Sequence, residues 1–491
     1  MAILKIHQGQ RMISVEFTPP MALSALLAAH DIHLAQPCGG RGSCGKCAVL
    51  LTGIISEPTA AEVRCGSRLS CQAILLGDAE ATLPEHLPME QIEGGSHIHL
   101  DPLQPMGGHY GAAVDIGTTT IALQLYDLTT GSCVGASSMR NPQTTVAADV
   151  IGRIDASLHG QGEALRHQVE NAMITLLAAA CSQAGVKSED VASLVVTGNT
   201  TMLYLLTERN PYSLSRAPFE ADCFFGTETG LFNRRVYLPA CLHAFVGADT
   251  SCALISCGMT RKNETALLCD IGTNGEMALW HQGKLYIAST AAGPAFEGAG
   301  ISCGCTSIPG AIDRVDLING QLHCHTIGNR PAVGICGSGL LDTVAALLDT
   351  EAMDETGYLE DEIIQLAEGV TLTQPDIRAV QLVKAATYAG IMCLLQAANC
   401  NIKDVNTLYI AGGFGSHLDL RSAVRIGLIP RELSDRVQVI GNAALDGASM
   451  LLMDVSLRET IAAFRAKTIH VRLDGNPDFA DRYVEAMLFE E

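Results

Sequence analysis

Four cysteines near the start of the chain have the spacing of a metal-binding set. Cys38, Cys44 and Cys47 lie in CGGRGSCGKC, and Cys71 follows in RLSC, which gives the spacing C-x5-C-x2-C-x23-C. Four thiolates can hold an iron–sulfur cluster. Glycines among them let the backbone wrap closely and point N–H groups at the cluster sulfurs. The glycines in question are Gly39, Gly40, Gly42 and Gly45.

This spacing favours a [2Fe-2S] cluster over structural zinc. Zinc ribbons have two short cysteine pairs, whereas here one pair is combined with two isolated cysteines. Residues 1 to about 80 resemble the β-grasp [2Fe-2S] ferredoxins, and the five-residue first gap is most similar to the adrenodoxin branch. Cys65 could compete as the fourth ligand, but RLSCQ, which contains Cys71, matches the ferredoxin pattern better.

Two further segments place an aspartate before a glycine turn. AVDIGTTT at 113–120 contains Asp115, and LCDIGTNG at 268–275 contains Asp270. Such a carboxylate can hold a metal ion through water, and the turn can bind phosphate oxygens. One copy alone is an ordinary strand and turn, but its recurrence indicates two related lobes that clamp a triphosphate. The predicted phosphate-binding residues are Gly117, Thr118, Thr119, Thr120, Gly272, Thr273, Asn274 and Gly275.

A third turn follows the apolar run TLYI near residue 410. Its glycines would let an adenosine lie against the backbone, and it comprises Gly412, Gly413, Phe414 and Gly415. A plain helix-entry turn is the alternative. The order of two phosphate loops and then an adenosine turn resembles the actin, sugar-kinase and Hsp70 ATPase superfamily.

The elements that must position these residues form two domains. Strands are expected at Ile3–Ile6 and Met12–Phe17, a helix at Leu23–His30, and short strands near Val49 and Leu69. Strands and helices alternate from Tyr110 onward. We therefore expect an α+β β-grasp ferredoxin domain at 1–82, an exposed linker at 83–109, and a two-lobed α/β ATPase domain, a duplicated RNase H-like fold, at 110–491.

Further motifs resemble the reductive activators of corrinoid-dependent methyltransferases over nearly the whole chain. These motifs are TGNTTM (197–202), VGAD (246–249), AGPAFEGA (292–299), GICGSGLLD (334–342) and NPDF (476–479). The resemblance implies ATP-dependent reduction of inactive Co(II) to Co(I) on a partner corrinoid protein. Longer relatives insert another domain between ferredoxin and ATPase, whereas only about 27 residues are available here.

The resemblance also implies roles for individual residues. Asp115 and Asp270 would organise Mg²⁺ and the attacking water, and Glu276 is a second candidate for positioning the water. Further ATP contacts are implied for Gly337, Ser338 and Gly339.

Composition limits the partners of the chain. A net charge of -21 argues against nucleic acid, which is bound by clustered Lys and Arg. We expect no membrane span and no secretory signal, and therefore a cytoplasmic protein whose 18 cysteines are mainly reduced. The partners expected from the resemblance are a corrinoid protein, an unidentified electron donor and a second copy in a homodimer.

Three alternatives remain at this point. A second metal site could form from Cys303, Cys305, His323, Cys324 and His325. The chain could be a small-molecule kinase with a regulatory ferredoxin, although nothing in the sequence marks a sugar pocket. It could also be a redox adaptor that binds ATP without hydrolysing it, although the paired carboxylates weigh against this.

Overall fold

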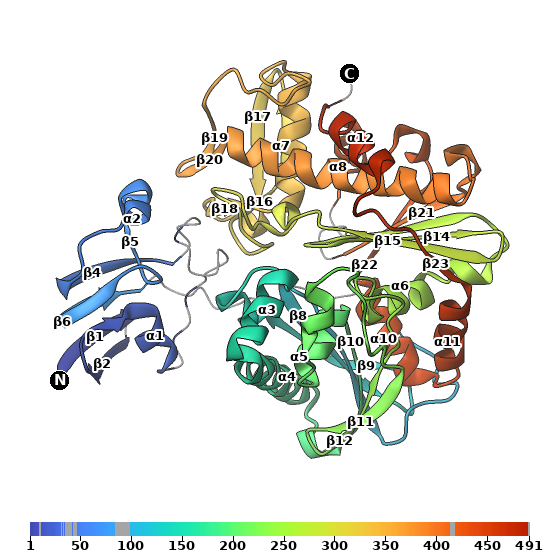
Figure 1. Ribbon diagram of the computed structural model, residues 1–491, viewed down its shortest axis with the longest axis horizontal. Helices are drawn as coiled ribbons and strands as arrows, with labels where there is room; N and C mark the ends of the chain where they lie inside the picture. Colours follow the sequence, from blue (N-terminus) through green and yellow to red (C-terminus); the bar gives the residue numbers. More distant parts are fainter. Residues whose placement is uncertain are drawn as a thin grey trace. The chain divides into compact units, whose positions relative to one another are not determined.

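The computed structural model describes residues 1–8, 11–30, 32, 34, 42, 47–83, 99–412 and 418–489. The chain falls into two units, Met1–Glu90 with Pro142–Val169, and Gln91–Asn141 with Glu170–Glu491. Figure 1 labels most of the elements of both units. Helix α3 (Val150–Ala156) and the first residues of α4 (Gly162–Ala184) are grouped with the first unit.

A small mixed sheet forms the first unit, with strand order β2-β1-β6-β4-β5 and β3 paired to β6. Leu4 and Ile6 of β1 are buried while Ile3 is exposed, the alternation of a strand with one face on a core. β1 runs antiparallel to β2 and parallel to β6. The elements are β1 (Ala2–Gln8), β2 (Arg11–Phe17), β3 (Met21–Ala22), α1 (Leu23–Ala28), β4 (Ala48–Ile55), α2 (Ala60–Cys65), β5 (Arg68–Leu69) and β6 (Ile74–Thr82).

This arrangement confirms the predicted β-grasp ferredoxin fold. The strands expected at Ile3–Ile6 and Met12–Phe17 are β1 and β2, and the expected helix is α1, which ends at Ala28. Strands β4 and β5 contain Val49 and Leu69.

Each half of the second unit contains the same arrangement of four strands. In the first half, β7, β8 and β9 form an antiparallel meander and β10 lies parallel to β7. In the second half, β13, β14 and β15 form the meander and β21 lies parallel to β13. The bounds are β7 (Tyr110–Ile116), β8 (Thr120–Asp127), β9 (Cys133–Arg140), β10 (Val191–Gly198), β13 (Ala266–Ile271), β14 (Gly275–His281), β15 (Lys284–Thr290) and β21 (Thr407–Ala411).

The repeat confirms the predicted duplication, because the two aspartate-glycine turns occupy the same place in both halves. Each turn joins the first two strands of its meander. Two strands complete the first sheet, β11 (Thr227–Leu231) and β12 (Arg234–Leu238), and two complete the second, β22 (Val437–Gly441) and β23 (Thr468–His470).

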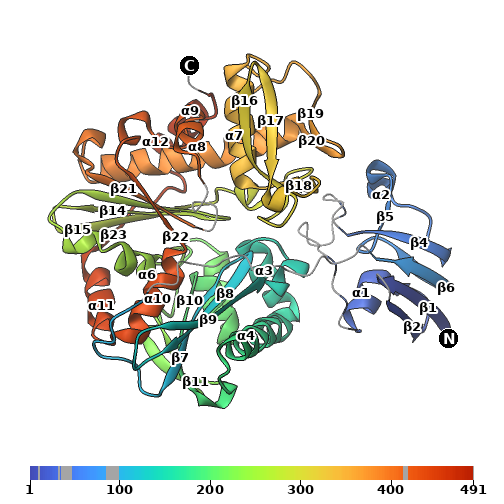
Figure 2. The same cartoon turned by 180° about the vertical axis from the view of Figure 1, so that it is seen from behind.

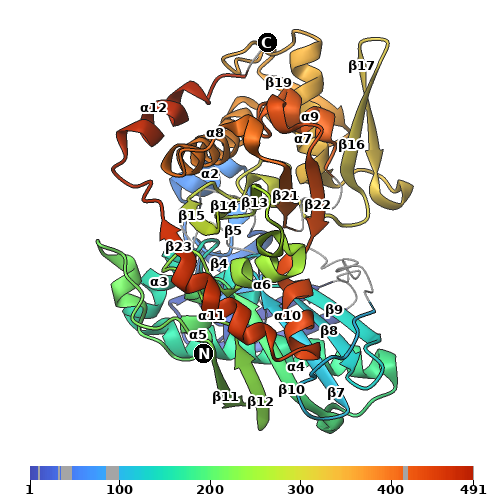
Figure 3. The same cartoon turned by 90° about the vertical axis from the view of Figure 1, so that its right-hand side faces the viewer.

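Helices α6 (Ala248–Cys257) and α10 (Ala443–Met453) lie between the two sheets. One apolar cluster joins residues of both helices to Ala113 and Val195 of the first sheet and to Leu268 of the second. A Cβ on Gly447 would come within 2.0 Å of a backbone carbonyl of α6, so the close approach of the two helices requires glycine. Figure 3 shows both helices below the second sheet, with α8 on its other side.

Helix α8 (Gln374–Ala397) packs on β14 and β15. Among the described helices it is the one that is long and apolar enough to cross a membrane by length and composition. Most of its apolar stretch is buried inside the unit, as in the core helix of a globular domain (Figure 2).

The remaining elements of the second unit surround this core. Helix α7 packs on a three-stranded sheet, β17-β16-β18, and β19 pairs with β20. Their bounds, with those of the other helices, are β16 (Ala311–Ile318), β17 (Gln321–Thr326), β18 (Gly334–Ile335), α7 (Gly337–Asp349), β19 (Ile363–Ala367), β20 (Val370–Thr373), α5 (Thr200–Leu206), α9 (Leu420–Arg425), α11 (Leu457–Lys467) and α12 (Pro477–Glu485).

One residue of the expected linker packs on the second unit. The segment 83–109 was expected to be an exposed linker, and most of residues 99–109 are exposed, but Met106 is buried. Met106 is 1% exposed within the apolar cluster that contains α6 and α10. Its backbone N–H donates to the carbonyl of Leu452 at 2.9 Å. Met106 therefore attaches an otherwise largely exposed segment to the second unit.

Candidate functional site

Acidic side chains from several elements gather where the two meanders turn. Asp115 lies near the end of β7 and Asp270 near the end of β13, where it pairs across the sheet with Glu276 of β14. Asp249, from the first turn of α6, joins them. The predicted carboxylates are thus brought together, and Asp249 adds one that the sequence analysis had quoted only within a motif.

Protein atoms around these carboxylates raise their pKa values. Burial, followed by repulsion from neighbouring carboxylates, raises the pKa of Asp115, Asp249 and Asp270 to about 7 in each case. Hydrogen bonds oppose the rise for Asp115, which accepts from Asn442, and for Asp249, which accepts from the Thr250 N–H. The pKa of the fully buried Glu276 is also raised, by burial and then by Asp249 and Asp270. A site with this much crowded negative charge suits a cation.

The two turns are held by matching hydrogen bonds. In the first, the N–H of Asn141 donates to the Thr119 carbonyl at 2.7 Å. In the second, the N–H of Gly293 donates to the Thr273 carbonyl at 3.0 Å. The Asn141 side chain also donates to the Gly117 carbonyl at 2.8 Å. Both turns are therefore fixed by the segment that follows the third strand of their meander.

Glycine is required where these turns close. A Cβ on Gly117 would lie 2.5 Å from the Thr120 carbonyl, and one on Gly275 would lie 2.6 Å from Oγ1 of Thr290. A Cβ on Gly272 would lie 3.0 Å from a carboxylate oxygen of Glu297, with the Asn274 carbonyl at 3.8 Å.

Two asparagines at helix starts point their amides into the site. Asn199 caps α5 and donates to Oγ1 of Thr118 at 3.1 Å. Asn442 caps α10 and donates to Oδ2 of Asp115 at 3.1 Å. Each side chain therefore caps its helix through its oxygen and donates a hydrogen bond to the site through its amide nitrogen. The sequence analysis quoted Asn199 only within a motif and did not mention Asn442, although each is an asparagine directly before a helix.

The adenosine turn begins beside Asp270. Gly412 follows β21 with φ +105°, and a Cβ there would lie 2.9 Å from Oδ1 of Asp270 and 2.9 Å from the Ile271 carbonyl. The structure thus brings one predicted adenosine residue to the predicted metal-binding carboxylate. Gly413, Phe414 and Gly415 lie outside the described residues.

Glu297 is a further acidic residue that the sequence analysis did not select. Its carboxylate accepts from the backbone N–H of Thr273 at 2.8 Å and from the Thr273 hydroxyl at 2.9 Å. It also accepts from the hydroxyl of Thr119. A single side chain therefore joins the two predicted phosphate turns. The signal available in the sequence was its position in AGPAFEGA, close after the second meander.

Gly337, Ser338 and Gly339 form the start of α7. A Cβ on Gly339 would lie 2.3 Å from the Ile312 carbonyl, so this glycine is needed for α7 to pack on β16. The hydroxyl of Ser338 lies 3.3 Å from Sγ of Cys336. These contacts give Ser338 and Gly339 a packing role, and the ATP contact of all three residues stays a prediction.

In the first unit the structure describes two of the four predicted cluster ligands. Sγ of Cys47 and Sγ of Cys71 lie 3.3 Å apart, and no disulfide joins them. Cys65 ends α2 and is exposed. Cys38 and Cys44 lie outside the described residues. Two unbridged thiols at this distance fit a shared metal centre, so the residues present fit an iron–sulfur cluster.

A buried ion pair fixes the segment that carries Cys71. Glu62 of α2 is 2% exposed and pairs with Arg68 at 2.9 Å. It also accepts from the N–H of Leu69 at 3.0 Å. Burial alone would raise the pKa of Glu62, but the N–H groups of Thr59 and Leu69, together with Arg68, hold it below the usual value.

The second metal site considered above is not assembled. His325 pairs with Asp316 at 2.8 Å, while Cys303 lies 3.4 Å from the Thr371 N–H. Within the described residues, no group of three or more His, Cys, Asp or Glu side chains could hold a metal ion directly. A cation among the carboxylates of the second unit would therefore need water or phosphate oxygens to complete its ligands.

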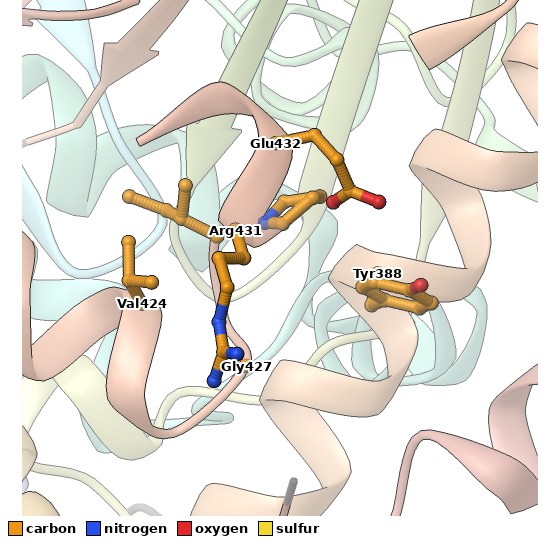
Figure 4. A pocket seen from close by; sticks show the side chains of 7 residues that line it. Tyr388, Val424, Gly427, Arg431 and Glu432 are labelled. Atoms are coloured by element: carbon orange, nitrogen blue, oxygen red, sulfur yellow. The ribbon is translucent and has the colours of Figure 1, made fainter. Parts of the chain in front are cut away.

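A separate cavity of about 300 Å³ lies between α8 and the segment after α9 (Figure 4). No predicted site residue lines it. Its lining consists of Tyr388, Val424, Gly427, Ile429, Pro430, Arg431 and Glu432.

Three family models match the chain in succession. Residues 6–76 match the 2Fe-2S iron-sulfur cluster binding domain, residues 110–262 match the RACo middle region, and residues 264–491 match the C-terminal domain of RACo, the ASKHA domain. These matches support an iron–sulfur cluster in the first unit and ATP binding in the second.

Curated relatives and a solved structure agree with the family models. The chain is 36% identical over 423 residues to the corrinoid activation enzyme RamQ of Eubacterium limosum, covering 77% of this chain and 70% of that protein. It is 27% identical over 401 residues to the [Co(II) methylated amine-specific corrinoid protein] reductase of Methanosarcina barkeri, covering 73% and 72%. A solved reductive activator for corrinoid,iron-sulfur protein has a TM-score of 0.74 at 25% identity, with 99% of this chain and 98% of that chain covered. The chain belongs to the family of reductive activators of corrinoid proteins.

Proposed function

We propose that this protein uses ATP to pass an electron from its cysteine-bound cluster to a partner corrinoid protein, reducing inactive Co(II) to Co(I). The observation that carries this proposal is the combination, in a member of this family, of an electron-carrying unit and an ATPase unit in one chain. One electron leaves the cluster and one reaches the cobalt. An external donor of the class of low-potential reductants must restore the cluster.

The second unit supplies the ATPase part of this function. Asp115 and Asp270 would organise Mg²⁺ and the attacking water, with Glu276 and Asp249 beside them. Carboxylates and phosphates repel each other unless a cation lies between them, so the crowding of acids supports Mg²⁺ as part of the site. Thr118, Thr119, Thr120, Thr273 and Asn274 would bind phosphates.

The cluster cysteines supply the redox part. Cys38, Cys44, Cys47 and Cys71 would hold a [2Fe-2S] cluster, which stores and releases one electron. Such centres lie near about -400 mV. Transfer of the electron to an acceptor costs about 2.3 kcal/mol for each 100 mV by which the reduction potential of the acceptor is lower. An acceptor a few hundred millivolts lower therefore needs free energy from another source.

Coupling would be conformational. In the second unit the ATPase site lies at equivalent turns of two sheets, with α6 and α10 between them. A nucleotide that contacts both turns can change how the two halves of the second unit are arranged. The two arrangements would differ in their affinity for the partner. Phosphate need not reach the corrinoid protein. A small-molecule kinase would instead transfer phosphate to its substrate, and a non-hydrolysing adaptor would bind ATP without turnover.

Several finer features belong to the same proposal. The domain limits are 1–82 for the ferredoxin domain, 83–109 for the linker and 110–491 for the ATPase domain, supported by the spans of the family models. A cytoplasmic location and a homodimer are proposed as well. Sedimentation of the full chain tests the homodimer.

The test is anaerobic incubation of the full chain with a Co(II) corrinoid protein, a reductant and ATP, followed by absorption spectroscopy. We expect the Co(I) spectrum to develop with ATP and not without it. Transfer of labelled phosphate to a small molecule, with no change in cobalt state, would instead indicate the kinase.

A further inference from the structure

Glu297 is delivered to the phosphate turns by a tightly fixed loop. It ends a short 3-10 helix, Ala295–Glu297, whose Phe296 is 4% exposed. Gly298 follows with φ +74°, and a Cβ there would lie 2.1 Å from the Cys305 carbonyl. The N–H of Glu297 donates to the Pro294 carbonyl at 3.0 Å. The position of this carboxylate is therefore set by the fold.

The groups that Glu297 contacts are hydrogen-bond donors of the kind that bind phosphate. They are the Thr273 N–H and hydroxyl in the second turn and the Thr119 hydroxyl in the first. An ionised carboxylate only accepts hydrogen bonds, as a phosphate oxygen does. The backbone of a turn that follows a strand is also a common anion site. A nucleotide phosphate at these donors and the Glu297 carboxylate would therefore compete for the same protons.

The negative charge of Glu297 also reaches the rest of the site. It is one of the groups that raise the pKa of Asp270, after burial and Asp249. A triphosphate that enters beside it would meet this charge in addition to those of the aspartates. Release of Glu297 from the turns would remove both the competition and part of the repulsion.

We propose that Glu297 is an exchangeable anionic latch. It bridges the two phosphate turns when nucleotide is not bound, and nucleotide phosphates displace it by taking over its donors. The exchange replaces a protein carboxylate that links the two halves of the second unit with a ligand whose phosphates are hydrolysed and released. This proposal rests on the proposed ATP site at these turns. It adds to that site a residue whose position depends on whether nucleotide is bound.

The opposite role would be a carboxylate that stays in place and positions Mg²⁺ or water for the bound nucleotide. The two roles predict opposite changes in affinity. Removal of a latch strengthens nucleotide binding, because the nucleotide no longer has to break the hydrogen bonds between Glu297 and the turns before it can bind. Removal of a positioning carboxylate leaves binding unchanged or weakens it.

The experiment compares Glu297→Gln and Glu297→Ala with the wild-type full chain, and measures binding of a non-hydrolysable ATP analogue with Mg²⁺ by calorimetry. We expect both variants to bind about tenfold more tightly, which corresponds to about 1.4 kcal/mol. Glu264→Gln is the matched control, since it removes one negative charge at an exposed position of the same unit. It should bind as the wild type does.

A second readout concerns the turns themselves. Hydrogen exchange at the Thr273 amide should be faster in nucleotide-free Glu297→Ala than in the wild type, and nucleotide should restore its protection in both proteins. Unchanged or weaker nucleotide binding by both Glu297 variants would overturn the latch. If the wild-type protein itself bound no ATP analogue, the proposed ATP site would fail instead.

Discussion

Binding of Mg·ATP to the carboxylates of the second unit should release protons. Asp115, Asp249 and Asp270 each have a pKa of about 7 because burial and mutual repulsion favour their protonated forms. A divalent cation beside them favours the ionised forms and lowers these pKa values. The perturbation is therefore a change of pH across neutrality, with nucleotide binding as the readout.

The magnitude follows from the number of titrating groups. Because the pKa values of the three aspartates are raised to about 7, the group keeps bound protons near neutrality that Mg·ATP can displace. For each proton released, the binding constant rises about tenfold per pH unit. We expect binding to strengthen between pH 6 and pH 8 by at least about tenfold.

Calorimetry in buffers of different ionisation enthalpy measures this proton release directly. A plot of the observed binding enthalpy at pH 7 against the ionisation enthalpy of the buffer has a slope equal to the number of protons exchanged. We expect this slope to correspond to the release of at least about one proton. Asp249→Asn should lower the number of protons released, because it removes one titrating carboxyl and also one cause of the raised pKa values of Asp270 and Glu276, and Glu264→Gln should not change it. Proton uptake, or a slope of zero, would refute the assignment of these carboxylates to the cation site.

Three further predictions follow from the same contacts. The nucleotide-free protein should lose thermal stability as pH rises from about 5 to 8. Acids whose pKa is raised in the folded state stabilise the fold fully below about pH 4, and this contribution is lost as pH rises through about 7. A higher Tm at pH 8 than at pH 5 would contradict the burial argument. Cys71→Ser should lose or alter the cluster while Cys65→Ser keeps about two irons per chain, measured by iron analysis, and the reverse result would reassign the fourth ligand. Gly412→Ala should strain the turn by about 1–3 kcal/mol and weaken ATP binding, whereas Gly283→Ala, also at positive φ but with open space around it, should leave binding unchanged.

The local patterns of the sequence predicted the architecture well. Strand alternation located β1 and β2, and the repeated aspartate-glycine turn revealed the duplication, because both signals depend on neighbouring residues. The order of the three turns, through its resemblance to the ATPase superfamily, also indicated that Asp115, Asp270 and Gly412 belong to one site, and the structure places Gly412 beside Asp270.

The rest of the site depends on tertiary contacts that no local pattern reveals. Asn199 and Asn442 each precede a helix, and only the packing of α5 and α10 directs their amides to Thr118 and Asp115. Glu297 lies 178 residues from Thr119 along the chain, yet it accepts a hydrogen bond from it. The end of the linker lacked periodicity, so no local pattern showed that Met106 would join the apolar cluster that contains α6 and α10.

The most direct test of the account is Co(I) formation by a variant whose ATPase site is disabled while its cluster is intact. In Asp270→Ala the cluster should still be reduced by the donor, because its cysteines lie in the other unit. With a weak reductant, ATP and a Co(II) corrinoid protein, absorption spectroscopy should then show a reduced cluster and no Co(I), while the wild-type protein forms Co(I). Formation of Co(I) by the variant at the wild-type rate would contradict ATP as the driver of electron transfer.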